Sequence, residues 1–230
     1  MNSFDLSILS FLNQFAHRSN TFDQAVVLLS DANLLKGVVI VGLMWWVWFE
    51  RQDTQRKREA VLAALIVSVP ALVVAKILTR VMMRPRPLVD ERLQSVLHYG
   101  IDNTNWRQVS SFPSDHAVLF FAMATGIFFA SRRAGWLAFF YVSTFICLPR
   151  VYLGVHYPTD ILAGAAIGMF PVWLANRPGL RKPITGWPLR LTESNPSLFY
   201  SLAFMVLYLV AELFDPLLKI LHFIIHRRIN

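Results

Sequence analysis

Long apolar runs separated by short polar segments dominate the chain. Their lengths suit helices that cross a lipid bilayer. Six runs stand out: residues 34–49, 60–78, 117–130, 135–148, 161–175 and 197–213. Several are shorter than the ~20 residues of an ideal span, so their ends are expected to shift by a few residues. The pattern predicts an all-α fold, a polytopic membrane helix bundle with about six transmembrane helices.

An amphipathic segment, residues 7–16, precedes these runs. It carries four apolar side chains at helical spacing, namely Ile8, Phe11, Leu12 and Phe15. No Lys or Arg precedes Arg18, so the positively charged start of a signal peptide is missing. We expect a helix lying in the membrane interface. A packed first helix explains the same pattern equally well.

The composition agrees with a membrane protein. Hydrophobic residues make up 55% of the 230 and charged residues only 16%, whereas soluble domains carry about a quarter charged residues. A soluble enzyme and a disordered chain are both disfavoured. The lone cysteine, Cys147, excludes a disulfide framework and a multi-cysteine metal site, and its apolar neighbours predict a buried thiol.

The distribution of basic residues predicts the orientation in the membrane. With alternate crossings, the segments 50–59, 131–134 and 176–195 share one side and hold four, two and four Lys or Arg residues. The positive-inside rule makes that side cytoplasmic. The net charge of +8 does not indicate nucleic-acid binding, because the basic residues are dispersed among hydrophobic runs. Segments 80–115 and 149–160 then face outward, although they carry further arginines: Arg80, Arg84, Arg86, Arg92, Arg107 and Arg150.

Three polar islands lie at that outer face: residues 84–87 (RPRP), 110–116 (SSFPSDH) and 150–160 (RVYLGVHYPTD). Each has an ordinary structural explanation. Arg-Pro pairs end helices, Pro-Ser-Asp starts one with Ser114 or Asp115 as the cap, and a His and an Asp four residues apart form a helical pair. Ionisable residues at the ends of three spans on one face nevertheless favour a functional site.

These residue types together suit phosphoryl transfer. Arginine forks bind phosphoryl oxygens, and backbone N–H groups at the helix start near His116 add positive potential. A neutral imidazole attacks phosphorus, and a second, protonated imidazole gives its proton to the leaving oxygen. No carboxylate cluster indicates a di-metal centre, so arginines would stabilise the charge in place of metal ions.

The three islands resemble the signature of the type 2 phosphatidic acid phosphatase superfamily: Lys-x6-Arg-Pro, then Pro-Ser-Gly-His, then Ser-Arg-x5-His-x3-Asp. The resemblance covers residues 76–160, and the third island matches it from the arginine onward. Asp115 replaces the usual Gly and Pro149 the usual Ser, and Lys76 is not seven residues before either Arg-Pro arginine. The resemblance implies a single membrane-embedded phosphatase domain over residues 1–230, without metal or cofactor.

Residue roles follow from the resemblance. His156 would be the nucleophile that forms a phosphohistidine, Asp160 would hold its other ring nitrogen, and His116 would protonate the leaving group and then activate water. The phosphate ligands would be Arg86, preferred to Arg84, together with Ser114, Arg150 and Lys76. Arg80 is an alternative to Lys76. Asp115 would cap the helix, position His116 or repel a second charge.

The variant motifs are similar to the undecaprenyl-diphosphatase branch of the family. This likeness implies a bacterial inner-membrane enzyme that converts undecaprenyl diphosphate to the monophosphate at the outer face. The partners would be the lipid substrate and membrane lipids, with no nucleic acid. The alternatives are a phosphatase for phosphatidylglycerophosphate, phosphatidate or a lipid A phosphate, a lipid phosphotransferase, and a non-catalytic transporter or lipid-binding subunit.

Overall fold

The computed structural model describes residues 2–90 and 109–212, and this part of the chain contains helices and loops but no β-strand. The elements, in chain order, are α1 (Ser3–Asn13), α2 (Asn20–Asp31), α3 (Asn33–Phe49), α4 (Thr54–Val81), the 3-10 turn η1 (Pro87–Val89), α5 (Asp115–Ala130), α6 (Arg132–Tyr141), the π-helical stretch η4 (Val142–Cys147), α7 (Leu148–Tyr152), α8 (Pro158–Ala175), α9 (Pro178–Ser194) and α10 (Pro196–Ala211). The all-α prediction is confirmed. Arg92 and Arg107 lie outside the described residues.

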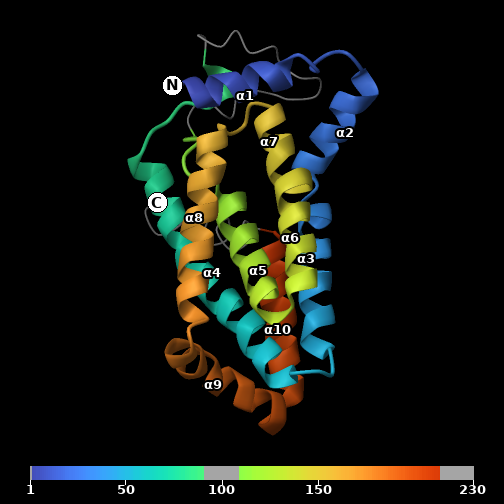
Figure 1. Ribbon diagram of the computed structural model, residues 1–230, viewed down its shortest axis with the longest axis vertical. Coiled ribbons are helices and arrows are strands. Elements are labelled where there is room, and N and C mark those ends of the chain that lie inside the picture. The colour runs from blue at the N-terminus through green and yellow to red at the C-terminus, as the bar shows by residue number, and fades with distance from the viewer. Residues whose placement is uncertain (1, 91–108, 213–230) are drawn as a thin grey trace, which may run out of the picture.

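Six rods form an elongated bundle: α3, α4, α5, the continuous α6–η4–α7 rod, α8 and α10 (Figure 1). Helix α1 lies across one end of the bundle and α9 across the other. Each predicted apolar run falls within one of these rods, apart from residue 212, which follows α10, and residue 213, which lies outside the described residues.

Three rods are long and apolar enough to cross a membrane: Thr54–Val81 with 28 residues, Arg132–Tyr152 with 21 and Pro158–Ala175 with 18. A fourth candidate combines α2 with residues 35–49 of α3 across a bend of 56°. Helices α5 and α10 are apolar and have 16 residues each. The chain is therefore a helical membrane protein, and the count of six crossings stays a prediction.

The first helix combines both expectations for the N-terminus. Asn2 caps α1 by accepting a hydrogen bond from the Asp5 amide. Asp5 and Leu9 are buried, and Leu9 packs against Val151 and Tyr157 near the site. The opposite face exposes aromatic rings such as Phe11, whose exposed fraction is 57%. The helix is thus packed on one side and open to lipid or water on the other.

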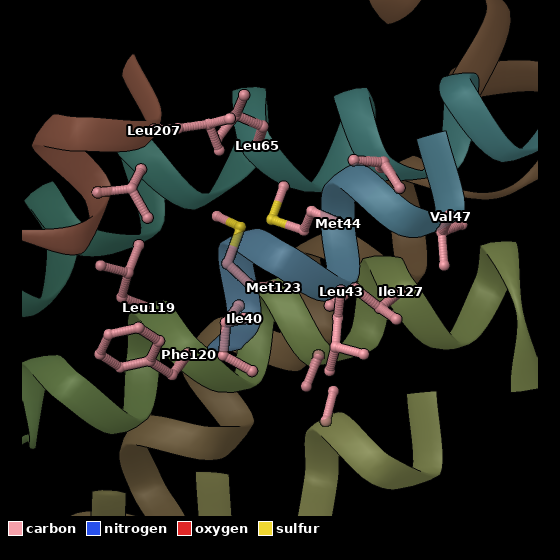
Figure 2. Close-up of a cluster of buried hydrophobic side chains, with 14 of the residues drawn as sticks. Ile40, Leu43, Met44, Val47, Leu65, Leu119, Phe120, Met123, Ile127 and Leu207 are labelled. Atoms are coloured by element: carbon pink, nitrogen blue, oxygen red, sulfur yellow. The ribbon is translucent and has the colours of Figure 1, made fainter. Parts of the chain in front are cut away.

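Helix α5 forms the centre of the core. Phe120, Met123 and Ile127 are fully buried and meet side chains from α3, α4 and α10, including Ile40 and Met44 (Figure 2). Cys147 is buried as well, as predicted. A continuous core of this kind holds the polar ends of α5 and α8 in fixed positions.

Two glycines allow α8 to lie directly against the start of α5. A Cβ atom added to Gly164 would lie 2.6 Å from the Ser114 carbonyl oxygen, and one on Gly168 would lie 2.1 Å from that of Val118. Any larger residue would push the two helices apart. This contact places the first turn of α5, which carries His116, beside the first turn of α8, which carries Asp160.

Candidate active site

The ends of α5, α7 and α8 meet at one end of the bundle, and local sequence fixes where α5 and α8 begin. The Ser114 hydroxyl accepts a hydrogen bond from the Ala117 amide at 3.4 Å, so Ser114, rather than Asp115, caps α5. Pro158 occupies the first turn of α8, where its missing N–H costs nothing. The Ser114 amide in turn donates to the Asp160 carbonyl at 3.3 Å, which joins the two helix starts.

A tight turn between α7 and α8 carries His156. Gly154 has φ of +68°, a conformation that favours glycine, and its carbonyl accepts a hydrogen bond from the Leu88 amide at 2.8 Å. The amides of Val155 and His156 both donate to the Arg150 carbonyl, at 2.9 and 3.2 Å. The imidazole is therefore fixed by backbone contacts on both sides.

The two ring nitrogens of His156 have different surroundings. Nδ1 lies 2.8 Å from the Ser111 carbonyl oxygen, so Nδ1 carries the proton and donates it to that oxygen. The Asp160 carboxylate is 3.9 Å from Nδ1, beyond hydrogen-bond distance. Nε2 is buried and has no hydrogen-bond partner among the described residues. This tautomer leaves a lone pair on Nε2.

Burial lowers the pKa of His156 well below the ordinary value for histidine, and the positive charges of Arg86 and Arg150 lower it further. The imidazole is therefore neutral at physiological pH. A neutral ring with an unshared Nε2 lone pair has the electronic state of a nucleophile.

His116 lies between an acidic and a basic partner. Its Nδ1 is 2.9 Å from a carboxylate oxygen of Asp115, the residue where the family pattern has Gly. Its Nε2 is 2.7 Å from a guanidinium nitrogen of Arg150 and 3.3 Å from the ammonium nitrogen of Lys36. Arg150 contacts His116, and its positive charge also acts on His156, so one guanidinium group influences both imidazoles.

The two arginines of the first island have different environments. The Arg86 guanidinium is buried and donates to the carbonyl oxygens of Val155, Val109 and Ser110 at 2.9, 3.2 and 3.2 Å. Burial lowers the pKa of Arg86 to about 10, so the group stays protonated at neutral pH. Its charge is the largest electrostatic influence on His156.

Arg84 instead joins structural elements. Its guanidinium donates to Asp160, to Asp5 at 2.8 Å and to the Thr159 hydroxyl at 2.9 Å. It also stacks over the Tyr157 ring, 4.0 Å from the centroid. Asp160 is thus held by Arg84 and by the Tyr157 amide, which donates to it at 2.8 Å.

Lys76 reaches the edge of the site despite its departure from the family spacing. Its ammonium nitrogen lies 2.8 Å from an Asp115 carboxylate oxygen, so Asp115 bridges Lys76 and His116. Arg80, the alternative ligand, is exposed to the surroundings of the protein. The structure therefore brings together the predicted site residues, which are His116, His156, Asp160, Arg86, Ser114, Arg150 and Lys76.

Two side chains of this network, those of Asp5 and Lys36, lie outside residues 76–160, to which the family resemblance extends. Asp5 lies 154 positions before Thr159, which it contacts, and nothing in the local sequence indicates that pairing. Lys36 stands within the apolar run 34–49. A charged residue inside a predicted span indicates a functional position, so the sequence did contain a signal for Lys36.

Comparison with known proteins agrees with this geometry. The model of the PAP2 superfamily matches residues 59–181, more than half of the chain. The chain belongs to the PAP2 superfamily. The match contains all seven predicted site residues, whereas Asp5 and Lys36 lie before it. The family and the apolar helices make this protein a membrane-embedded phosphatase, a hydrolase.

Three curated relatives align with most of this PAP2 protein. The bacitracin transport permease protein BcrC of Bacillus licheniformis is 28% identical over 74% of this chain and 80% of its own length. The undecaprenyl-diphosphatase BcrC of Bacillus subtilis is 26% identical over 81% and 91%, respectively. The putative undecaprenyl-diphosphatase YbjG of Escherichia coli is 24% identical, also over 81% and 91%. No solved structure matches the chain.

Proposed function

We propose that this protein hydrolyses undecaprenyl diphosphate, or a closely related polyprenyl diphosphate, to the monophosphate through a phosphohistidine at the extracytoplasmic face of a bacterial inner membrane. The observation that carries the mechanism is the state of His156. Its Nδ1 is held by the Ser111 carbonyl, and its buried Nε2 has no hydrogen-bond partner within the described part of the chain. A histidine held in this way is ready to attack an electrophile without first losing a proton.

In the first step, the Nε2 lone pair of His156 attacks the terminal phosphorus. The bond between this phosphorus and the bridging oxygen breaks, and its electron pair moves to that oxygen, which stays on the lipid monophosphate. His116 gives a proton from Nε2 to this oxygen. Nε2 of His116 lies against Arg150. When the anionic substrate binds between the two groups, Nε2 takes up a proton from solvent, and this is the proton that it gives to the leaving oxygen.

In the second step, water attacks the phosphohistidine. His116 accepts a proton from the water, the P–N bond breaks, and the electron pair returns to Nε2 of His156. Inorganic phosphate leaves with His156 neutral again. His116 is protonated again at Nε2 and releases this proton to solvent when Arg150 returns to it. A lipid hydroxyl in place of water would make the protein a phosphotransferase.

Arg86 and Arg150 supply fixed positive charge where the transferred phosphoryl oxygens gain negative charge. Both guanidinium groups are held by hydrogen bonds, Arg86 by backbone carbonyls and Arg150 by Nε2 of His116. The Ser114 amide and hydroxyl lie at the adjacent helix start. Lys76 and Asp115 complete the site beside His116. Asp160 acts by holding the start of α8 together with Arg84, which positions His156.

The lipid assignment is supported by the names of relatives. Two of the three described above are named undecaprenyl-diphosphatases, one of them as putative, and the chain covers 91% of each. The rival lipids are phosphatidylglycerophosphate, phosphatidate and lipid A phosphates. All of these lipids carry a phosphoryl group that can be transferred. They differ in the group that stays bonded to the leaving oxygen.

The outward orientation is supported by the arrangement of the basic segments. The Arg56 side chain donates to the Phe129 carbonyl at the end of α5, and Arg181 of α9 pairs with Glu59 at 3.0 Å. The three basic segments therefore gather at the end of the bundle opposite α1 and α7 (Figure 1). If that end is cytoplasmic, the histidines lie at the outer face.

The test is phosphate release by purified protein, with chelator present, from a panel of polyprenyl diphosphate, phosphatidylglycerophosphate and phosphatidate. We expect the polyprenyl diphosphate to react fastest, and His156→Ala to lower turnover by several orders of magnitude while the thermal midpoint changes little. A covalent, acid-labile phosphoenzyme should form in the wild type and not in His156→Ala. Normal turnover in that variant would rule out the mechanism, and a reporter fused within residues 80–115 that functions in the cytoplasm would rule out the orientation.

A further inference from the structure

Lys36 is a buried cation on the first turns of α3, before the matched family segment. Its exposed fraction is only 2%. The ammonium nitrogen donates to the Ser30 carbonyl at 2.6 Å and lies 3.3 Å from Nε2 of His116. Burying an ammonium group is costly, so its position beside one ring nitrogen needs a chemical reason.

The position of Lys36 relative to His116 distinguishes it from Arg86. Arg86 acts on His156, the side on which the transferred phosphoryl group binds. Arg150 contacts His116 and also acts on His156, so it lies toward both groups, whereas the ring that Lys36 contacts is that of His116, the residue proposed to serve the leaving oxygen. Within the proposed mechanism, Lys36 is therefore on the leaving-group side of the bond that breaks.

The two substrate classes differ at that place. In a diphosphate, the leaving oxygen is bonded to a second phosphorus, whose other oxygens are negatively charged. In a lipid monophosphate, the same oxygen is bonded to carbon, so the leaving group carries no second phosphate whose anionic oxygens an ammonium group could bind. A cation beside the leaving oxygen therefore binds one class of leaving group and not the other.

We propose that Lys36 binds the phosphate that stays on the lipid and thereby makes the enzyme selective for diphosphates over monophosphates. This inference rests on the proposed function. Lys36 donates hydrogen bonds to the retained phosphate in the bound substrate. When the P–O bond breaks and its electron pair moves to the leaving oxygen, the ammonium group stabilises the added negative charge.

The experiment compares farnesyl diphosphate with farnesyl monophosphate, which have the same lipid chain. We expect Lys36→Met to lower kcat/KM for the diphosphate ~10- to 100-fold, the effect of removing one hydrogen bond to a charged group. The monophosphate rate should fall less than the diphosphate rate, because both reactions use His116 beside Lys36, but only the diphosphate has a second phosphate for Lys36 to bind. Lys36→Arg should retain most of the preference for the diphosphate.

Lys57→Met is the matched control. Lys57 is also a buried lysine, but it pairs with Glu50 at 2.9 Å near the start of α4, and this helix starts at the end of the bundle opposite α1 (Figure 1). Its removal should leave the ratio of the two rates unchanged. Because both substrates are measured on one preparation, the ratio does not depend on how much of a variant is folded.

The outcomes separate the two hypotheses. If Lys36→Met leaves the ratio of the diphosphate rate to the monophosphate rate unchanged, whether or not both rates fall, the role of Lys36 is overturned. The proposed function then still stands. A wild type that hydrolyses only the monophosphate overturns the proposed function and the inference together. A loss confined to the diphosphate supports both.

Discussion

The carboxylate of Asp5 accepts two hydrogen bonds from Thr159, one from the backbone amide at 3.0 Å and one from the hydroxyl at 2.7 Å. The first helix is thereby attached to the first turn of α8. The same carboxylate pairs with Arg84, whose other contacts are Asp160 and Thr159. Helix α1 is thus part of the framework that positions the turn carrying His156.

This attachment predicts that Asp5→Ala lowers both stability and turnover. The loss of a buried acceptor of three hydrogen bonds should cost ~1–3 kcal/mol, because Arg84 and Thr159 lose a charged partner. Asp5→Asn, which keeps an acceptor oxygen, should have a smaller effect. Thermal unfolding in detergent measures the stability, and phosphate release measures the turnover.

Asp31→Asn, an exposed change at the end of α2, is the control. Unchanged unfolding in Asp5→Ala would show that α1 is not attached in this way.

Arg84 and Arg86 should fail in different ways when each is changed to Lys. Arg84→Lys loses a forked contact with three side chains, so the thermal midpoint should fall while inhibition by inorganic phosphate is retained. Arg86→Lys should weaken phosphate inhibition about tenfold or more, as expected when one charged hydrogen bond is lost. Inhibition constants do not depend on the folded fraction, so they separate the two roles. If phosphate inhibition weakened in Arg84→Lys and not in Arg86→Lys, Arg84 would be the phosphate ligand and Arg86 the structural residue.

The contact between α5 and α8 predicts that Gly168→Ala is harmful. The added methyl group would lie 2.1 Å from the Val118 carbonyl oxygen, so the helices must separate. We expect a destabilisation of ~1–3 kcal/mol, typical of overpacking, together with reduced turnover. Gly186→Ala is the matched control, because it lies inside α9 with nothing within 4 Å of the new atom. That change should stabilise the helix by ~0.5–1 kcal/mol. Equal effects of the two changes would contradict the close contact.

The lowered pKa of His156 gives a pH prediction. A histidine whose folded pKa lies below 6.5 stays neutral as the pH falls through 6.5 and becomes protonated only at lower pH. In His116→Asn, where His156 is the remaining imidazole of the site, the rate of phosphoenzyme formation should therefore be level from pH 8 to 6.5. The rate should decline only in more acidic buffer. Rapid-quench measurements across this range test it, and a midpoint at or above pH 6.5 would contradict the burial of the ring.

The sequence predicted the parts of the site that depend on local pattern. Apolar runs identified the rods, and the spacing between Arg150, His156 and Asp160 identified the chemistry, because both features lie within short stretches. Lys36 and Asp5 escaped prediction because they reach the site only through tertiary contacts, across 80 and 154 positions. The same is true of the partner of His156 Nδ1, which the resemblance assigned to Asp160, whereas the structure has the Ser111 carbonyl at 2.8 Å.

Helix α4 has a consequence for how the enzyme meets its lipid. Its 28 residues extend for roughly 42 Å, well beyond the ~30 Å hydrocarbon layer, so it must lean within the bilayer or project into the headgroups. If the helix projects at that end, Lys76 in its last two turns would stand at headgroup depth together with Asp115. A site at that depth would process a lipid phosphate with its tail still dissolved in the membrane, without the energetic cost of transferring that tail into water.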